Sequence, residues 1–172
     1  MAPEDKSVGL VASVLGCTAA AAIAYGLASV VGLPHPLWAC IFALIASQGS
    51  LANPLSAMGG RVVGTILGVA VTIAVNAAIS RWAIDFAWQM LVDVAICAAI
   101  IWRRPAIQAC LWTPPIVLMT AAPGESIVVV GVSRGCEVIL GVVIGGLLHM
   151  AAQKASGWAR SPRWRRDQGA KP

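Results

Sequence analysis

Six long apolar stretches, separated by short breaks that contain proline, glycine or charged residues, fill most of the chain. We place these stretches at residues 8–31, 36–50, 55–79, 84–102, 105–122 and 126–151. A helix needs about 20 apolar residues to cross the hydrocarbon core of a bilayer. The pattern therefore predicts an all-α, polytopic membrane protein with six transmembrane helices in residues 1–153 and a basic cytoplasmic tail over residues 154–172.

The breaks contain residues that stop or start helices. Pro34 and Pro36 cannot continue the first helix, and Asn53 before Pro54 offers a cap followed by a proline in the first helical turn. The first apolar stretch is longer than the apolar region of a signal peptide, about 7–15 residues, and follows an acidic start. We therefore expect it to remain as the first helix.

The composition indicates a membrane protein and gives no sign of an enzyme. Of the 172 residues, 59% are hydrophobic and 11% are charged, and the mean hydropathy is +0.82. A soluble domain carries roughly 25% charge. The sequence contains no P-loop, Ser/His/Asp pattern, metal-ligand set or cofactor loop, so we expect no enzymatic activity, metal or cofactor. The five cysteines lie in apolar stretches and are expected to be small buried side chains.

The distribution of Lys and Arg predicts the orientation. With the N-terminus inside, Arg81 alone lies outside. The cytoplasmic side then receives Lys6, Arg61, Arg103, Arg104, Lys154, Arg160, Arg163, Arg165, Arg166 and Lys171. We expect a multi-pass protein of the bacterial inner (cytoplasmic) membrane with both termini in the cytoplasm. Trp38 and Trp82 should then lie near the outer interface, and Trp102 near the inner one.

The basic tail is expected to bind membrane lipids rather than nucleic acid. It places Arg160, Arg163, Arg165 and Arg166 directly after the last apolar stretch. Basic residues in that position are attracted to the anionic inner leaflet.

A short motif occurs twice. Arg61–Gly68 and Arg134–Gly141 both read R-x-x-x-x-I-L-G, and Ala39-Cys40 is mirrored by Ala109-Cys110. Three helices repeated once give two halves that are inverted in the membrane, which is typical of transporters. The alternative is a chance match in a sequence rich in Leu, Val and Gly.

Two of the six stretches are short or broken at matching positions in the two halves. Residues 36–50 are few for a span, and residues 105–122 contain Thr113-Pro114-Pro115. Proline removes a backbone donor, which is tolerated in a bilayer only where protein or water lines the helix. These two stretches therefore indicate a binding site, unless they are simple kinks.

Glycines at four-residue spacing predict close packing between helices. They are Gly60, Gly64 and Gly68 in the third stretch, and Gly131, Gly135, Gly141 and Gly145 in the sixth.

Three charged residues lie deep within the stretches, where an ionisable side chain is costly and usually functional. Asp93 has no partner on its own helix and no counterpart in the repeat; it is expected to be a proton or substrate site, or a buried ion pair or hydrogen bond. Arg134 and Glu137 are one helical turn apart. They either neutralise each other, or Arg134 binds a substrate carboxylate while Glu137 is protonated. Because all three charges together would leave a net −1 inside, we expect one carboxyl to be neutral.

Several uncharged residues complete the candidate site. Gln48 ends the second stretch and would bind substrate or cap a helix. Gln108, Trp112 and Thr113 in the fifth stretch suit an aromatic acid, although Trp112 could equally be a core residue. His35 lies between two prolines and is expected to be a loop residue.

These residues resemble a known family. The segment from Trp38 through Gln48-Gly-Ser50 to the R-x-x-G-T-x-x-G element at Arg61–Gly68, with the second copy at Arg134–Gly141, resembles the membrane block of the fusaric acid resistance (FUSC) family. Relatives of that family include aromatic acid exporters and, more distantly, plant aluminium-activated malate transporters. The resemblance covers residues 8–151. It implies a six-helix membrane domain that passes organic anions, and it matches only Arg61, Gly64, Thr65 and Gly68 to the family motif.

The chain lacks the large cytoplasmic region that usually follows this membrane block. We therefore expect a homodimer or other homo-oligomer, or a separate cytoplasmic subunit. The leading hypothesis is an exporter of small organic, most plausibly aromatic, acid anions driven by protons or by the membrane potential. One alternative is an oligomeric anion channel with Arg61 and Arg134 in its pore. Another is a non-transporting scaffold or accessory subunit of a larger exporter.

Overall fold

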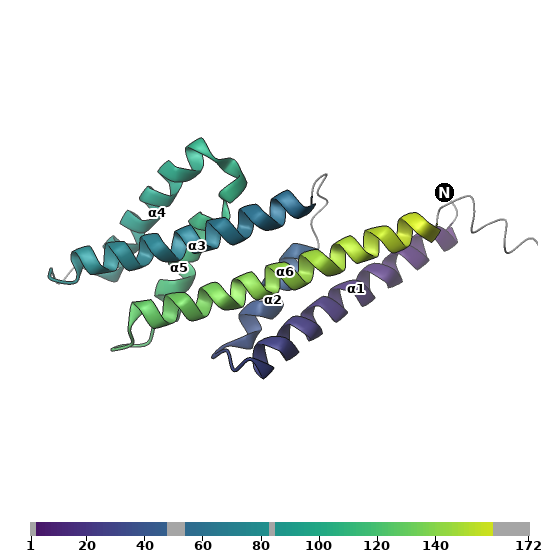
Figure 1. Cartoon of the computed structure of the whole chain (residues 1–172), viewed down its shortest axis with the longest axis horizontal. Coiled ribbons are helices and arrows are strands. Elements are labelled where there is room, and N and C mark those ends of the chain that lie inside the picture. Colours follow the sequence, from purple (N-terminus) through teal and green to yellow (C-terminus); the bar gives the residue numbers. More distant parts are fainter. Residues whose placement is uncertain (1–2, 48–53, 83–84, 160–172) are drawn as a thin grey trace, which may run out of the picture.

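The structure is a computed structural model that describes residues 3–47, 54–82 and 85–159. Within those ranges it contains helices, turns and loops but no strand (Figure 1). The elements are α1 (Pro3–Val30), α2 (Pro36–Ser47), α3 (Pro54–Ile79), α4 (Phe86–Arg103), a 3₁₀ turn (Pro105–Ile107), α5 (Ala109–Thr120) and α6 (Ile127–Ala159).

Three helices are long and apolar enough to cross a membrane. They contain the segments Leu55–Ile79, Phe86–Arg103 and Ile127–Ala152, while Val14–Val30 and Pro36–Ser47 are shorter apolar helices. Most of these helical surfaces remain exposed in the isolated chain, including Leu15, Trp88 and Met119. Exposed apolar side chains on long apolar helices are what a lipid environment requires, and the chain is a membrane protein.

Two helices are much shorter than the rest. α2 and α5 contain 12 residues each, so each spans about 18 Å, against a hydrocarbon core of about 30 Å. The connection before each of them lies inward of the ends of the long helices α3 and α6 (Figure 1). Prolines flank the start of α2, and Arg104 before Pro105 has a non-helical backbone (φ −144°, ψ 79°), as a residue before proline often does.

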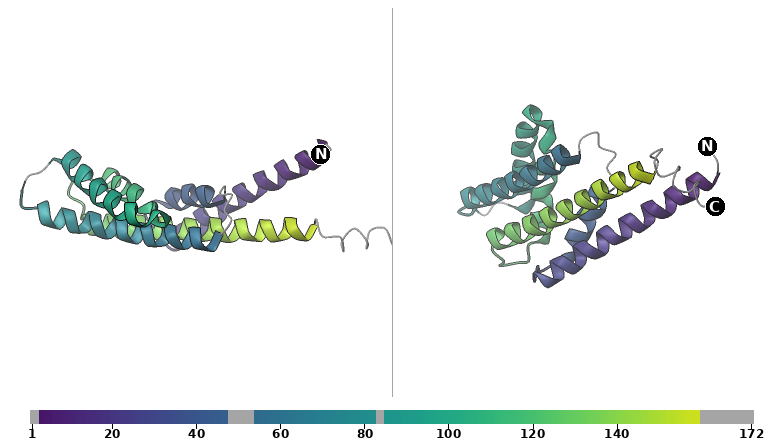
Figure 2. Two further views of the ribbon diagram at one scale, coloured as in Figure 1. Left: turned by 90° about the horizontal axis from the view of Figure 1, so that it is seen from above. Right: turned by 45° about the vertical axis from the view of Figure 1, so that its right-hand side comes forward.

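The two halves of the chain pack in the same way. α3 and α6 lie side by side in the centre, α2 packs against α6, and α5 packs against α3. α1 covers α2 and α6, and α4 covers α5 and α3. The start of α1 and the end of α6 lie at the same end of the molecule, where the two helices diverge (Figure 2).

Two expected boundaries differ from the structure. The fifth stretch was expected as one helix over residues 105–122, but the structure divides it into the 3₁₀ turn and α5. Pro105 is the first residue of the turn, and Gln108 lies between the turn and α5. The sixth stretch, expected to end at residue 151, continues as helix to Ala159. The expected tail over residues 154–172 therefore begins inside α6, and its later residues lie outside the described ranges.

Glycines on α6 allow its backbone to contact the backbone of α2. A Cβ atom added at Gly141 would lie 2.3 Å from the Ala39 carbonyl oxygen, and one added at Gly145 would lie 2.2 Å from the Ala43 carbonyl oxygen. Neither distance is possible for a real side chain. Gly131 and Gly135 of the same helix face Val69 of α3, at 3.2 Å and 3.4 Å for the added Cβ atoms.

Glycines on α3 make the matching contacts with the second half. Added Cβ atoms at Gly60 and Gly64 would lie 2.1 Å and 2.7 Å from the carbonyl oxygens of Ala106 and Ile107. At Gly68 the added atom would lie 2.5 Å from Cβ of Thr113. All seven glycines named from the sequence therefore face helices or turns of the same chain.

Candidate functional site

A cavity of about 820 Å³ lies between the two short helices α2 and α5, with α3 and α6 beside it. Its wall is mainly apolar and aromatic, with a few polar groups. The lining residues of α2 and α3 are Trp38, Ile41, Phe42, Ile45, Ser56, Ala57, Arg61 and Thr65. Those of the second half are Ala106, Gln108, Ala109, Trp112, Thr113, Ile116, Val138 and Val142.

Helical spacing explains how α2 reaches the cavity. Side chains three or four positions apart share a helix face. On α2 one such face carries the aromatic residues Trp38 and Phe42, whose ring centroids are 6.4 Å apart. The adjacent face carries Ala39, Ala43 and Ala46, which are buried and small enough for α6 to approach closely. The small alanines thus let α2 pack closely against α6, and the aromatic residues on the other face line the cavity.

Trp38, expected near the outer membrane interface, lines this cavity. Its position relative to the membrane stays a prediction. Trp82 and Trp102 are 71% and 89% exposed, and neither lines the cavity. Trp112 is 67% exposed and is a lining residue rather than a core residue.

The cavity contains one charged side chain among its described lining residues, that of Arg61. Thr65 lies one helical turn further along α3. Its hydroxyl is buried and has no hydrogen-bond partner among the described residues. Gln108 and Thr113 lie on the α5 side, and the Thr113 hydroxyl donates to the Ala109 carbonyl at 2.8 Å. The wall thus offers a guanidinium, an amide and a hydroxyl within an otherwise apolar surface.

The structure brings together four of the residues predicted from the sequence and separates three others. Arg61, Gln108, Trp112 and Thr113 line the cavity. Asp93, Arg134 and Glu137 are buried elsewhere. Gln48 lies outside the described residues.

Arg134 and Glu137 form a buried ion pair on α6. The second Glu137 carboxylate oxygen accepts a hydrogen bond from the backbone N–H of His35 at 2.9 Å. The other Arg134 nitrogen contacts Nδ1 of His35. Arginine can only donate, so Nδ1 of His35 is the acceptor in this contact. The two inner charges therefore neutralise each other and hold the α1–α2 connection.

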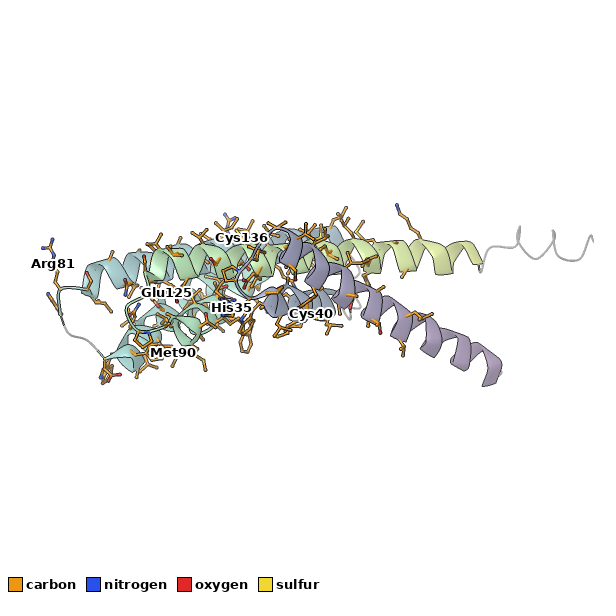
Figure 3. The ribbon with its side chains drawn as sticks, turned by 90° about the horizontal axis from the view of Figure 1, so that it is seen from below. His35, Cys40, Arg81, Met90, Glu125 and Cys136 are labelled. Atoms are coloured by element: carbon orange, nitrogen blue, oxygen red, sulfur yellow. The ribbon has the colours of Figure 1, made fainter. Side chains whose placement is uncertain are left out.

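His35 is a loop residue, as expected, but its contact with the inner charges was not predicted. Figure 3 shows it well inward of Arg81, which marks the end of the molecule at the α3–α4 connection. The His35 carbonyl also accepts from the Trp38 backbone N–H at 3.1 Å. The contact with α6 thus fixes where α2 begins and, with it, one wall of the cavity. The only sequence signal was a histidine between two prolines.

Asp93 lies on α4 and is fully buried. Neither of its carboxylate oxygens has a hydrogen-bond partner among the described residues. α5 lies between Asp93 and the cavity, because Thr113 faces the cavity while the free thiol of Cys110 on the same helix interacts with that of Cys97 on α4. Asp93 therefore belongs to a second polar region, separate from the cavity.

The family model of fusaric acid resistance protein-like proteins matches residues 19–148. The chain belongs to this family. The matched range contains α2 and α5, and therefore both sides of the cavity. Comparison with curated proteins and with solved structures found no match.

Membership in the fusaric acid resistance protein-like family confirms the resemblance seen in the sequence. It is a family of membrane transport and efflux proteins rather than of enzymes. The structure also gives a physical account of the family element R-x-x-G-T-x-x-G. Arg61 and Thr65 face the cavity, whereas Gly64 and Gly68 allow α5 to pack closely against α3. The glycines of the motif thus allow the close packing of α5, and its arginine and threonine are the polar residues of the wall.

Proposed function

We propose that the chain exports small organic acid anions with an aromatic body, and that these bind in the cavity between α2 and α5. The observation that carries this proposal is a single guanidinium, that of Arg61, in a cavity whose wall is otherwise mainly aromatic and apolar. Binding sites for small molecules commonly have volumes of roughly 300–1,000 Å³ with a few placed polar groups. The cavity volume of about 820 Å³ falls in that range.

Each polar group has a role in this proposal. The Arg61 guanidinium binds the carboxylate, because a planar fork of N–H donors matches two carboxylate oxygens. Trp38, Phe42 and Trp112 contact the aromatic ring. Gln108 lies in the same wall and is exposed, and its side-chain amide donates a further hydrogen bond to the anion.

The inverted repeat supports a transport cycle. Gly68 of α3 meets Thr113 of α5, and Gly141 of α6 meets Ala43 of α2. The two glycines are equivalent in the repeated motif, and Ala43 and Thr113 follow the equivalent Ala-Cys pairs by the same number of residues. The cavity lies between one short helix of each half. Movement of one half against the other would open it first to one side of the membrane and then to the other.

The orientation is part of the proposal. Both termini are cytoplasmic in the bacterial inner membrane, as the Lys and Arg distribution predicts. The shared end of α1 and α6 supports an even number of membrane crossings (Figure 2). The α3–α4 connection, with Arg81, then faces the outside.

The anion-channel alternative receives less support from the contacts. It requires Arg61 and Arg134 to line a common pore, but Arg134 is buried and paired with Glu137 in its own chain. Transport is driven by protons or by the membrane potential, which repels an anion from a negative cytoplasm. Homo-oligomer formation, a separate cytoplasmic subunit and lipid binding by the tail arginines stay predictions. Those arginines lie outside the described residues.

The test is uptake of an aromatic carboxylate by proteoliposomes, with the uncharged amide of the same ring as a second solute. We expect Arg61→Gln to weaken binding of the carboxylate about 10- to 100-fold, since a hydrogen bond to a charged group contributes about 1.5–3 kcal/mol. Binding of the amide should barely change. Arg81→Gln, which alters an exposed arginine at the end of the molecule, is the matched control.

Equal loss of carboxylate binding in Arg61→Gln and Arg81→Gln would contradict the assignment of Arg61. Ohmic anion current, unsaturated at high concentration, would favour the channel. Absence of transport by well-folded protein, together with co-purification of a larger exporter, would favour the accessory-subunit alternative.

A further inference from the structure

α4 turns a polar stripe toward the interior of the second half. Gln89, Asp93 and Cys97 lie four residues apart and are the buried residues of this helix. A stripe with that spacing occupies one helix face. In an otherwise apolar helix, three polar or ionisable residues on the buried face call for a functional explanation.

The neighbours of Asp93 on the stripe show what it faces. Gln89 accepts a hydrogen bond from the Asn76 side chain of α3 at 3.5 Å. Cys97 is a free thiol that interacts with the free thiol of Cys110 on α5. Asp93 lies between these two contacts, so it points into the junction of α3, α4 and α5.

The α3 hydroxyl that helical register places near Asp93 already has a partner. α3 and α4 are consecutive antiparallel helices, and Asn76 of α3 is paired with Gln89 of α4. One helical turn away from this pair, Thr72 on α3 and Asp93 on α4 are therefore expected at the same level. Thr72 is buried, and its hydroxyl donates to the Gly68 carbonyl of its own helix at 3.0 Å. It therefore has no proton left to donate to the carboxylate.

The charges around Asp93 do not compensate it. Among the described residues, the titratable group that interacts with it is Cys97 of its own helix, which is next to Cys110 of α5. The α3 residues near the stripe, Thr72 and Asn76, are neutral. No ion pair reaches Asp93 from the described residues. An ionised carboxylate in such surroundings is costly, whereas a carboxylic acid is tolerated.

We propose that Asp93 is a proton-binding site, separate from the substrate cavity, and that its protonation couples anion export to the proton gradient. The coupling rests on the proposed function, whereas the proton site does not. The step is simple: the carboxylate takes up one proton from one side of the membrane, becomes a carboxylic acid, and releases that proton to the other side. No other bond forms or breaks.

The place of Asp93 along α4 suits proton entry from outside. It lies seven residues after Phe86, the first residue of the helix, which is about 10 Å from that end. The pair Asn76–Gln89 lies between the end and Asp93 and provides polar side chains on the way. In the proposed orientation this end faces the outside, where a proton that drives export must enter.

α5 connects the proton site with the cavity. Cys110 contacts α4, and Thr113 on the next turn lines the cavity. Pro114 and Pro115 lack the N–H groups that would bond to the carbonyls of Cys110 and Leu111, so α5 has fewer internal hydrogen bonds than a regular helix. A change in the charge of Asp93 can therefore shift α5 and, with it, the wall of the cavity.

The test separates coupling from binding in proteoliposomes that contain the full chain. One assay measures accumulation of an aromatic carboxylate under an imposed pH gradient. The other measures exchange of labelled for unlabelled carboxylate at equal pH, which needs no net proton movement. We expect Asp93→Asn to lose pH-driven accumulation completely and to keep exchange near the wild-type rate.

Asp85→Asn is the matched control. It makes the same chemical change on the same helix, at an exposed cap that accepts from the Ala87 N–H at 2.8 Å. Both assays should stay at wild-type level. Accumulation at the wild-type level by Asp93→Asn would overturn a separate proton site. Loss of both exchange and accumulation in a folded Asp93→Asn protein would overturn it as well.

Infrared difference spectroscopy tests the proton site without substrate. Wild-type protein should show a carboxylic acid C=O band that titrates with pH, remains in Asp85→Asn and is absent from Asp93→Asn. If Asp93→Asn fails to fold, Asp93→Glu should keep the titrating band at a shifted frequency. Absence of a titrating band in the wild type overturns the proposal. If the band is present but no carboxylate is bound or transported, the proposed function fails and the proton site stands.

Discussion

The two halves of this transporter share one packing plan but differ in chemistry at one helix face. α1 turns Ala20, Ala24 and Ala28 toward its half, and all three are fully buried. α4, which holds the equivalent place in the second half, turns Gln89, Asp93 and Cys97 inward instead. The same arrangement of helices therefore has an apolar contact face in the first half and a polar one in the second half. The fold does not require the polar residues, so their presence in one half indicates a function.

A second difference concerns the repeated arginine. Arg134 is held by Glu137 and His35, whereas Arg61, its counterpart in the repeated motif, faces the cavity. The position equivalent to Glu137 in the first copy is Gly64, which lets α5 approach. At this position the first copy lacks the carboxylate that pairs with Arg134, and Arg61 lines the cavity instead.

The largest effect should come from making the first half resemble the second. Ala24→Asp would place a carboxylate among Ala20, Ala28 and Ala39, where no partner exists in the described core. We expect a loss of at least ~3 kcal/mol in the free energy of unfolding, since an unpaired buried charge is that costly. Thermal unfolding in detergent measures the change. Ala24→Ser, which adds a small polar group, is the control. Tolerance of Ala24→Asp would show that the two faces are equivalent.

Removing the partner of Arg134 should come next. Glu137→Gln keeps an acceptor for the His35 N–H but leaves the arginine charge uncompensated, at an expected cost of about 3–5 kcal/mol. Thermal unfolding in detergent measures the change. The double variant Arg134→Met/Glu137→Gln should recover most of the stability, because neither charge is then left alone. A single variant as stable as wild type would mean that Arg134 finds another counterion.

The smallest effect concerns the packing that both halves share. Gly68→Ala and Gly141→Ala insert methyl groups where α5 and α2 approach, and each should lower the free energy of unfolding by about 1–3 kcal/mol. Gly26→Ala, where the added Cβ meets nothing within 4 Å, should instead stabilise by about 0.5–1 kcal/mol. Thermal unfolding compares all three. A large difference between Gly68→Ala and Gly141→Ala would show that the halves pack unequally.

The helices could be predicted from the sequence because a bilayer leaves the backbone few choices. Every backbone polar group in hydrocarbon must be bonded internally, so long apolar stretches become helices and prolines mark their ends. Pro36 and Pro54 are first residues of helices in the structure. The division of the fifth stretch was missed, since Pro105 was read as the first residue of a helix rather than of a separate turn.

The site could be predicted only in part. Arg61 was found from the repeated motif, whereas Gln108, Trp112 and Thr113 were found from their place in the proline-containing fifth stretch. The contact of His35 with Arg134 and Glu137 joins residues 99 and 102 positions apart, and no periodicity reports such a contact. Asp93 had no visible counterpart because alanine and aspartate share no sequence signal. The buried face of α1 in the other half carries Ala20, Ala24 and Ala28 where α4 carries Gln89, Asp93 and Cys97.

The length of α6 has a mechanical consequence. Its 33 residues extend over about 50 Å, well beyond the ~30 Å of the hydrocarbon core. The same rigid rod touches the cavity wall at Val138 and Val142 and carries the last described turns away from the bilayer. A small tilt of α6 at the cavity would therefore become a larger displacement at Ala159, because the helix moves as one rigid unit. Any partner or lipid surface that holds that end would oppose the tilt, and would thereby adjust the transport cycle from a distance.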